Sequence, residues 1–394
     1  MSGPVPVSAN SLTIDVLPAL DDVAGLSASW NRLADGIPFR SWEWQAGWWR
    51  SYGATHRLFV MTAQDDERYV GIAPFYVEHA SPVGGVLRFL GSGEVCSDQQ
   101  GLLVEAGYES AVAEALADFL AIQVNSHSAS SSMPANRRSR TLPNWSLIEL
   151  EGMSATSPAN DRFLARLKEN DFHNHCSAPV NTWRLPLPPN IDAYTASLSK
   201  SSRRKVRAAL KQLATPNCRV TFTETEEDFE RLWSVLVQLH QRRRNSLGDA
   251  GCFDRRTHAQ FLYETAREWA RTGLLDLACV SLDDRPIAAE LCFRGDSTTF
   301  AYQIGIDPDY LHENPGWLVN TASIQRAIAL GQSWYDLCRG DEEYKHHMGA
   351  RPQPCGSCRI VPPRLRSQLW DVALLTQTTV KDWLKTGLFL TGMR

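Results

Sequence analysis

Two carboxylic acids and two tyrosines lie where this sequence could perform proton-transfer chemistry. Glu290 is enclosed by the apolar segment AAELCF, and Asp336 ends the apolar segment SWYDLC. Burial of the Glu290 carboxyl would raise its pKa toward the range useful for a general base, and Asp336 could act as a base or bind an amine. Tyr302, in TTFAYQIGI, and Tyr344, in RGDEEYKHH, are candidate general acids. A solvent-facing Glu290, a strand-end cap at Asp336 and simple packing of both tyrosines are the structural alternatives.

A strand, a Pro-Gly loop and a helix follow one another after Thr298, and the helix start is a candidate phosphate site. Asn314, Pro315, Gly316 and Trp317 stand at this junction in the segment HENPGW. The first backbone NH groups of a helix lack internal partners, and the helix dipole favours negative charge there. An ordinary helix start is the plainer interpretation.

Two clusters of charged residues are candidates for binding a substrate. His240 and Arg243, in LHQRRRNSLG, share one helical face and could hold an acidic acceptor or a phosphate. Arg339, Glu343 and Lys345, in RGDEEYKHH, could form a recognition loop. A solvated basic face and a salt-bridged surface turn are the respective alternatives.

A third basic cluster and a cysteine pair give weaker signals. The segment KSSRRKVRAALKQL, residues 200–213, concentrates positive charge in one predicted helix and could bind anionic ligands, RNA or a charged polymer, although a solvated helix is the plainer interpretation. Cys355 and Cys358 have CxxC spacing without a second paired set, so we expect no metal.

Composition indicates an ordinary globular protein. Apolar residues make up 43% and charged residues 21% of the 394 residues. The net charge of −4 provides no overall attraction for DNA or for an anionic membrane. No apolar run reaches the roughly 20 residues of a membrane helix, and nine cysteines without framework spacing favour a reducing compartment, so we expect a cytoplasmic protein.

The order of predicted elements indicates two α/β domains. We predict a disordered tail over 1–10, an N-terminal domain over 11–181 with a mobile loop at 126–144, and a C-terminal domain over 182–394. The boundary is placed at TWRLPLPPN because clustered prolines should not continue a central strand. Hairpins with Asp-Asp turns, near 65–66 and 283–284, occur in both halves and favour duplication. We expect each domain to have its own mixed sheet flanked by helices.

The chain resembles the GNAT-like acyltransferases labelled cellulose biosynthesis protein CelD or BcsL, which are related in fold to the FemAB peptidyltransferases. The resemblance extends over most of the chain. Its residues are Asp336, Arg339, Gly340, Tyr344 and Lys345 in YDLCRGDEEYK, Pro315 and Gly316, His240 and Arg243, and GIAPFYV with Asp98. Among them, His240 is also a candidate catalytic residue, and Asp98 is a candidate for binding substrate. The loop HENPGW departs from the usual GNAT phosphate-binding loop, which carries Gln or Arg followed by spaced glycines.

This resemblance implies two tandem GNAT-like domains, with the C-terminal one an N-acyltransferase. The implied donor is acyl-CoA, and the implied acceptor is an amine of a small molecule or of an envelope or glycan precursor. The strands on either side of the loop-helix unit should splay apart to admit the donor. Alternatives are an acyl-carrier protein as donor, a FemAB-like enzyme that uses aminoacyl-tRNA, and a non-catalytic binding partner in polysaccharide or envelope biosynthesis.

Overall fold

The computed structural model describes residues 9–17, 19–20, 25–80, 84–129, 143–177, 180–364 and 367–368. Most of the predicted tail and of the predicted mobile loop lies outside these residues. Where the structure does describe them, Ala9–Ser11 forms a short 3-10 helix, and the helix expected to end near residue 125 continues to Ala129.

The first half of the chain alternates helices with an antiparallel meander. Its elements are β1 (Thr13–Val16), α1 (Leu26–Leu33), α2 (Trp42–Tyr52), β2 (Arg57–Asp65), β3 (Arg68–Ala80), β4 (Gly84–Phe89), β5 (Leu103–Val104), α3 (Glu109–Ala129), β6 (Leu147–Ser154), α4 (Pro158–Glu169) and β7 (His173–Cys176).

The second half begins with one strand and two helices and then repeats a similar order. Its elements are β8 (Val180–Pro186), α5 (Ile191–Ser197), α6 (Lys200–Leu213), β9 (Cys218–Phe222), α7 (Glu226–Ser246), α8 (Arg256–Thr272), β10 (Leu275–Leu282), β11 (Arg285–Arg294), β12 (Thr298–Ile306), α9 (Pro315–Ala329), β13 (Trp334–Arg339), α10 (Glu343–His347) and β14 (Arg351–Val361).

Side-chain caps fix where several of these helices begin. The Ser41 hydroxyl accepts from the Trp44 backbone NH at the start of α2, and Thr225 caps α7 in the same way. Such caps satisfy backbone donors that have no partner inside the helix. At the far end of α8, Gly273 takes the left-handed conformation, with φ 72°, that closes a helix.

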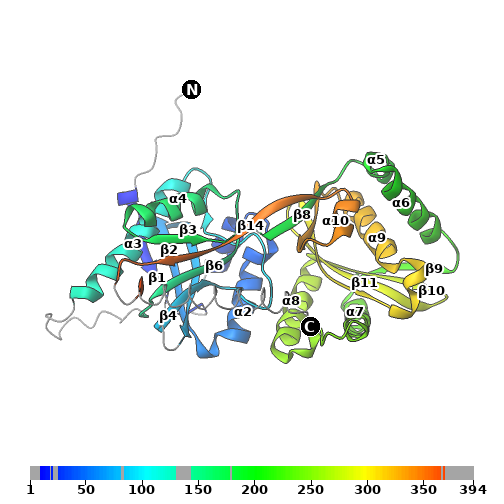
Figure 1. The fold of residues 1–394 in the computed structure, drawn as a ribbon, viewed down its shortest axis with the longest axis horizontal. Coiled ribbons are helices and arrows are strands. Elements are labelled where there is room, and N and C mark those ends of the chain that lie inside the picture. The colour runs from blue at the N-terminus through cyan, green and yellow to red at the C-terminus, as the bar shows by residue number, and fades with distance from the viewer. Residues whose placement is uncertain are drawn as a thin grey trace, which may run out of the picture.

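The described strands form one mixed sheet whose order is β1-β2-β3-β4-β6-β14-β8-β13-β12-β11-β10-β9, with β5 beside β3 and β7 beside β14. Figure 1 shows β14 and β8 crossing between the two halves. The predicted mixed α/β fold is confirmed. The expectation of a separate sheet in each half is wrong, because β14 returns to the first half and pairs with β6.

The prolines at the predicted boundary do not interrupt the sheet. Strand β8 contains most of the segment that we predicted to interrupt the sheet, and it lies between β14 and β13. Pro186 is its last residue, so the missing NH falls at the strand end, where a proline is tolerated.

Both predicted Asp-Asp hairpins are present, and they belong to matching units. The β2–β3 pair has an irregularity between Ala63 and Gln64, and the β10–β11 pair has one between Val280 and Ser281. In each half a short strand precedes the hairpin in the sheet, and the hairpin leads through a further strand and a helix to a parallel partner strand. This order supports the duplication that the sequence suggested.

Helices cover both faces of the sheet, and one core joins the halves. Trp44 and Trp48 of α2 are buried, and the Trp44 ring contacts Phe261 of α8 with ring centroids 4.8 Å apart. On the opposite face, α9 packs over β10 and β11. Among the described helices, none combines the length and apolar character that crossing a bilayer requires.

A disulfide joins Cys176 of β7 to Cys358 of β14. This pair could not be expected from the sequence, because the two residues are 182 positions apart and belong to no framework pattern. Cys279, Cys292 and Cys338 are free and buried.

Candidate active site

The candidate site begins where two parallel strands of the second half separate. Strands β12 and β13 pair at three positions, the last of which joins Phe300 to Asp336. Beyond it, β12 continues to Ile306 beside β11, whereas β13 continues to Arg339 beside β8. The edges that face each other across this gap therefore carry backbone groups available to a ligand.

A cavity of about 310 Å³ opens beside this gap. Its wall combines the end of β12, the start of α9 and the segment after β13, and it is lined by Ile304, Ile306, Leu311, Asn314, Pro315, Gly316, Trp317, Asn320, Tyr344 and Met348. The structure thus brings together the four residues predicted at the phosphate site with one of the two candidate tyrosines.

The start of α9 is built to admit an anion. The first turn of α9 contains no acidic residue, and Pro315 occupies the first helical position, where its missing NH costs nothing. A Cβ atom added at Gly316 would meet no other atom within 4 Å, so the backbone here faces open space. A phosphate could approach the helix NH groups directly.

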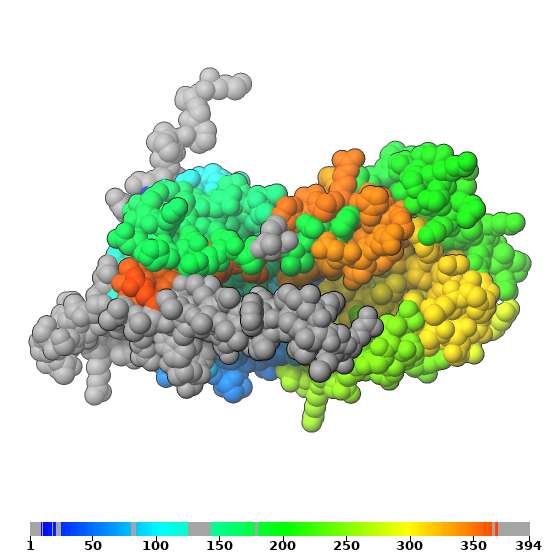
Figure 2. All heavy atoms as spheres, in the orientation of Figure 1, coloured from blue at the N-terminus to red at the C-terminus, as the bar shows by residue number. Residues whose placement is uncertain are grey.

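Basic side chains of α6 flank this helix start. Helix α6 packs against α9, and the Lys205 ammonium lies 5.1 Å from the centre of the Trp317 ring. Figure 2 shows α6 at the end of the molecule farthest from the first half. Its exposed basic residues are Lys200, Arg204, Lys205, Arg207 and Lys211.

Asp336 stands at the last position where β13 pairs with β12, on the face that meets the first half. Its side chain is 1% exposed, and burial raises its pKa to about 7. The Gln99 side-chain amide donates to Oδ2 at 2.8 Å, and the Cys338 backbone NH donates to Oδ1 at 2.8 Å. Near neutral pH this carboxyl can therefore exchange a proton, which a general base must do.

Glu290 has a similar pKa in a different setting. It faces inward, 2% exposed, and burial raises its pKa to about 7. The Tyr335 hydroxyl donates to Glu290 Oε2 at 3.1 Å and also contacts the Cys292 thiol at 3.4 Å. Neither carboxyl lines a described cavity, but Gln99, which binds Asp336, lines one, whereas Tyr335, which binds Glu290, is fully buried.

The two candidate tyrosines occupy different environments. The Tyr302 hydroxyl donates to the Val95 carbonyl at 2.8 Å, and its ring packs among Phe39, Trp44 and Phe293. Tyr344 lines the cavity beside α9 and is 39% exposed. A leaving group in that cavity could receive a proton from Tyr344 more directly than from Tyr302.

Asp98 and Arg339 bind each other across the two halves. Asp98 is 2% exposed, and it accepts from Arg339 Nε at 2.8 Å and from the Arg339 backbone NH at 2.8 Å. This double contact fixes the loop of the first half against the end of β13. Both residues were predicted to bind substrate, and in the structure each is the partner of the other.

Lys345 holds the segment that follows β13. Its ammonium donates to the carbonyls of Cys338, Arg339 and Gly340 at 2.8 to 3.1 Å and pairs with Glu342 at 2.9 Å. Cys338 takes an uncommon positive φ of 56°, so this clamp holds a strained turn in place. Its observed contacts are therefore those of a positioning residue.

The remaining predicted residues lie apart from the cavity beside α9. His240 is buried on α7, where its Nε2 lies 3.8 Å from the Cys252 sulfur and burial lowers its pKa. Arg243 makes no ion pair with any described residue. Glu343 is exposed and lies 3.6 Å from the His347 ring.

Three residues that the sequence did not single out complete the surroundings of Asp336. Gln99 binds it directly, and Arg184 is its cross-strand partner on β8. Arg40 Nε donates to the Gln99 carbonyl. Gln99 could have been found from the sequence because it directly follows Asp98, which was predicted. Arg184 was missed because its proline-rich context was interpreted as a domain boundary.

Part of the chain matches a known family. Residues 200–346 match the family model for the acetyltransferase (GNAT) domain. This range contains the separating strands, α9 and Asp336. No curated protein matches the sequence.

Solved structures share the fold of nearly the whole chain. FemX is 12% identical, with a TM-score of 0.61 over 88% of this chain and 98% of the FemX chain. A conserved protein of unknown function from Bacteroides thetaiotaomicron is 10% identical, with a TM-score of 0.54 over 89% of this chain and all of that one. A tandem GNAT protein from the clavulanic acid biosynthesis pathway is 12% identical, with a TM-score of 0.45 over 89% of this chain and 98% of that chain. The likeness to FemX shows a shared fold over nearly the whole chain.

Proposed function

We propose that the protein is an N-acyltransferase that moves an acyl group from acyl-CoA to the amine of a small molecule or of an envelope or glycan precursor. The observation that carries this proposal is the gap between β12 and β13, which opens beside a cavity at an acid-free helix start. Thioester donors with a long polar arm suit such a gap, since the arm can bond to unpaired strand edges.

The donor would be held at its two ends by different elements. The NH groups at Gly316 and Trp317 would receive the pyrophosphate, with Lys205 adding positive charge. The arm would run along the free edge of β12 toward Phe300 and Asp336, where the two strands rejoin. The thioester carbonyl would then lie near the Asp336 carboxyl.

Transfer then needs one bond made, one bond broken and two proton movements. The acceptor nitrogen attacks the thioester carbonyl, a carbon–nitrogen bond forms, and the carbon–sulfur bond breaks. Asp336 takes the proton that the nitrogen loses, after the acceptor has displaced the Gln99 amide from Oδ2. Tyr344 gives a proton to the departing thiolate and regains one from solvent. Positioned acid and base groups of this kind each contribute about 10²- to 10⁴-fold in rate.

Binding of the donor tests the proposal before any acceptor is known. Thermal unfolding of the purified protein should shift upward with CoA and acyl-CoAs, because a ligand that binds the folded state stabilises it by mass action. A shift with an acylated carrier protein and none with acyl-CoA would indicate that the carrier protein, rather than acyl-CoA, is the acyl donor. The absence of a shift with any thioester would refute thioester-dependent transfer.

A second candidate is a FemAB-like transferase that takes its acyl group from aminoacyl-tRNA. The exposed basic face of α6 favours it, since RNA binding depends on phosphate contacts by Lys and Arg. Binding of aminoacyl-tRNA with steep salt dependence, together with no binding of acyl-CoA, would select this candidate. The CelD or BcsL assignment is a further part of the proposal and rests on the resemblance of the sequence. The cytoplasmic location is another part and rests on the lack of framework spacing among the cysteines, and the disulfide between Cys176 and Cys358 speaks against it.

A further inference from the structure

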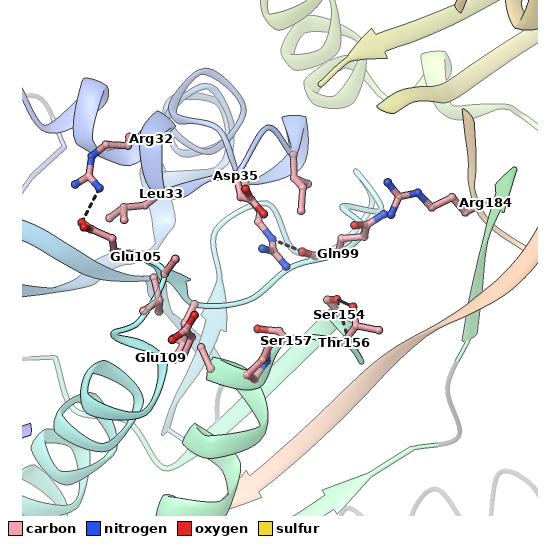
Figure 3. A pocket seen from close by; sticks show the side chains of 17 residues that line it. Arg32, Leu33, Asp35, Gln99, Glu105, Glu109, Ser154, Thr156, Ser157 and Arg184 are labelled. Carbon is pink, nitrogen blue, oxygen red and sulfur yellow. Dashed lines mark hydrogen bonds and ion pairs between the residues drawn. The ribbon is translucent and has the colours of Figure 1, made fainter. Parts of the chain in front are cut away.

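A second cavity, of about 550 Å³, lies on the side of the sheet that meets the first half. Figure 3 shows residues of several elements converging on it: Arg184 reaches from β8 toward Gln99, and Ser154, Thr156 and Ser157 form the opposite wall. Gln99 thus lines this cavity while its amide binds the buried Asp336.

Arg40 brings an unneutralised charge to this cavity. It is 8% exposed, and burial lowers the pKa of its guanidinium to about 10, a sign that nothing nearby compensates fully for lost hydration. The described residues give it one hydrogen bond, to the Gln99 carbonyl, and no ion pair. Its terminal nitrogens therefore have donors to offer a ligand in the cavity.

Arg184 adds a second such charge from the opposite half. Its Nη2 donates to the Thr298 hydroxyl at 2.7 Å, its Nε is buried without a described partner, and its guanidinium lies over the Trp334 ring at 4.5 Å. None of these contacts is an ion pair. Burial lowers the pKa of Arg184 as well, although the charge of Asp336 opposes that shift.

The acidic residues around the cavity do not neutralise this pair. Glu105 is bound by Arg32 at 2.7 Å and by Arg68 at 2.6 Å. Glu109 accepts from the Gly107 backbone NH. Asp35 is the acid that acts on Arg40 electrostatically, but it makes no ion pair within the described residues. Two arginines therefore face one cavity with spare donors, which is costly unless a ligand supplies negative charge.

We infer that this cavity binds an oxyanion, a carboxylate or a phosphate, between Arg40 and Arg184. If the proposed transfer is correct, the oxyanion belongs to the acceptor. Arg184 lies directly across the strand pair from Asp336, so a small acceptor held by its oxyanion would have its amine beside the base. Planar guanidinium groups bind both oxyanions through paired hydrogen bonds, which would also orient the acceptor.

Calorimetric titration with inorganic phosphate and with malonate tests this inference without acyl transfer. We expect each wild-type molecule to bind one ion in the cavity, and Arg184→Met, which keeps the length of the side chain but not its charge, to bind it at least tenfold more weakly. Lys168→Ala, which removes an exposed charge near the end of α4, should leave this binding unchanged. If Arg184→Met does not fold, Arg184→Lys serves in its place and should weaken binding by a smaller factor.

The outcomes separate the two proposals. Tighter binding of malonate supports a carboxylate acceptor, and tighter binding of phosphate supports a phosphorylated one. No binding of either ion, or equal binding by the wild type and Arg184→Met, overturns the inference. Binding that depends on Arg184 in a protein that binds no thioester would support the oxyanion site while contradicting thioester-dependent transfer.

Discussion

The two halves contain the same arrangement of parallel strands joined through a helix, and they differ in what fills the gap between the strands. In the first half, β4 pairs with β6 at two positions. Past that point Gln100 enters the gap: its NH donates to the Gly152 carbonyl at 2.7 Å, and its carbonyl accepts from the Ser154 NH at 3.0 Å. In the second half no described backbone bridges β12 and β13 beyond Phe300 and Asp336.

The helices that follow the two gaps differ in charge. Helix α3 has Glu109 in its first turn, which disfavours an anion there, whereas the first turn of α9 has no acid and lies beside Lys205. The gap between parallel strands is thus open in the second half and closed in the first. The closed half supplies Asp98 and Gln99, which secure the end of β13 and contact Asp336.

The largest effect is expected from Asp336→Asn, which tests whether the open gap between β12 and β13 is the reaction site. If the open gap is the reaction site, turnover should fall by about 10²-fold or more, as expected for loss of a general base. The melting temperature should change little, since an amide can still accept from the Cys338 NH. Steady-state kinetics per folded molecule would measure the effect. Unfolding of the variant with unchanged activity per folded molecule would assign Asp336 to structure.

The pH profile distinguishes Asp336 from Glu290, because both carboxyls have pKa values of about 7. A base must be deprotonated, so kcat should rise with pH and level off above about 7. Glu290→Gln should keep this rise, whereas Asp336→Asn should abolish it in the residual activity. The opposite pattern would indicate that Glu290, rather than Asp336, is the general base.

A block at the helix start tests whether the cavity beside α9 admits the donor. Gly316→Leu should weaken CoA binding by about tenfold or more, equivalent to about 1.4 kcal/mol, by filling the space that its Cβ would face. Gly316→Ala is the matched control, because a single methyl group leaves most of the cavity free and favours the helix. Equal affinities of the wild type and Gly316→Leu, measured by calorimetry, would place the donor elsewhere.

The smallest effect is expected at Lys205, which lies beside the start of α9. Lys205→Ala should weaken CoA binding about two- to fivefold, since exposed charges contribute less than about 1 kcal/mol. The difference from the wild type should shrink as salt is raised. Lys168→Ala, on α4 of the first half, is the control and should have no effect. A loss that does not change with salt would indicate that Lys205 acts through packing on Trp317.

The sequence could predict those features of the fold and of the site that depend on neighbouring residues. The Asp-Asp turns, the helix start at Pro315 and Gly316, and the buried carboxyls follow from neighbouring residues, and the structure contains each of them. The continuous sheet does not follow from local causes, because it depends on β14 returning to pair with β6.

Contacts between distant segments were likewise hidden from sequence reasoning. Gln99 and Asp336 are 237 positions apart, and the partners of Arg339 and Lys345 depend on how the first half and the turn after β13 are folded. A charged motif such as RGDEEYK identifies residues that matter, but it cannot tell a ligand contact from a contact that shapes the site.

Hydrogen exchange of backbone amides with and without CoA tests most directly the claim that one gap is open and the other closed. If the gap is open only in the second half, amide exchange should become slower on CoA binding at residues 301–306 and at the start of α9, with no change at residues 88–101 or at the start of α3. Protection of β4 and α3 instead, or equal protection in both halves, would contradict it.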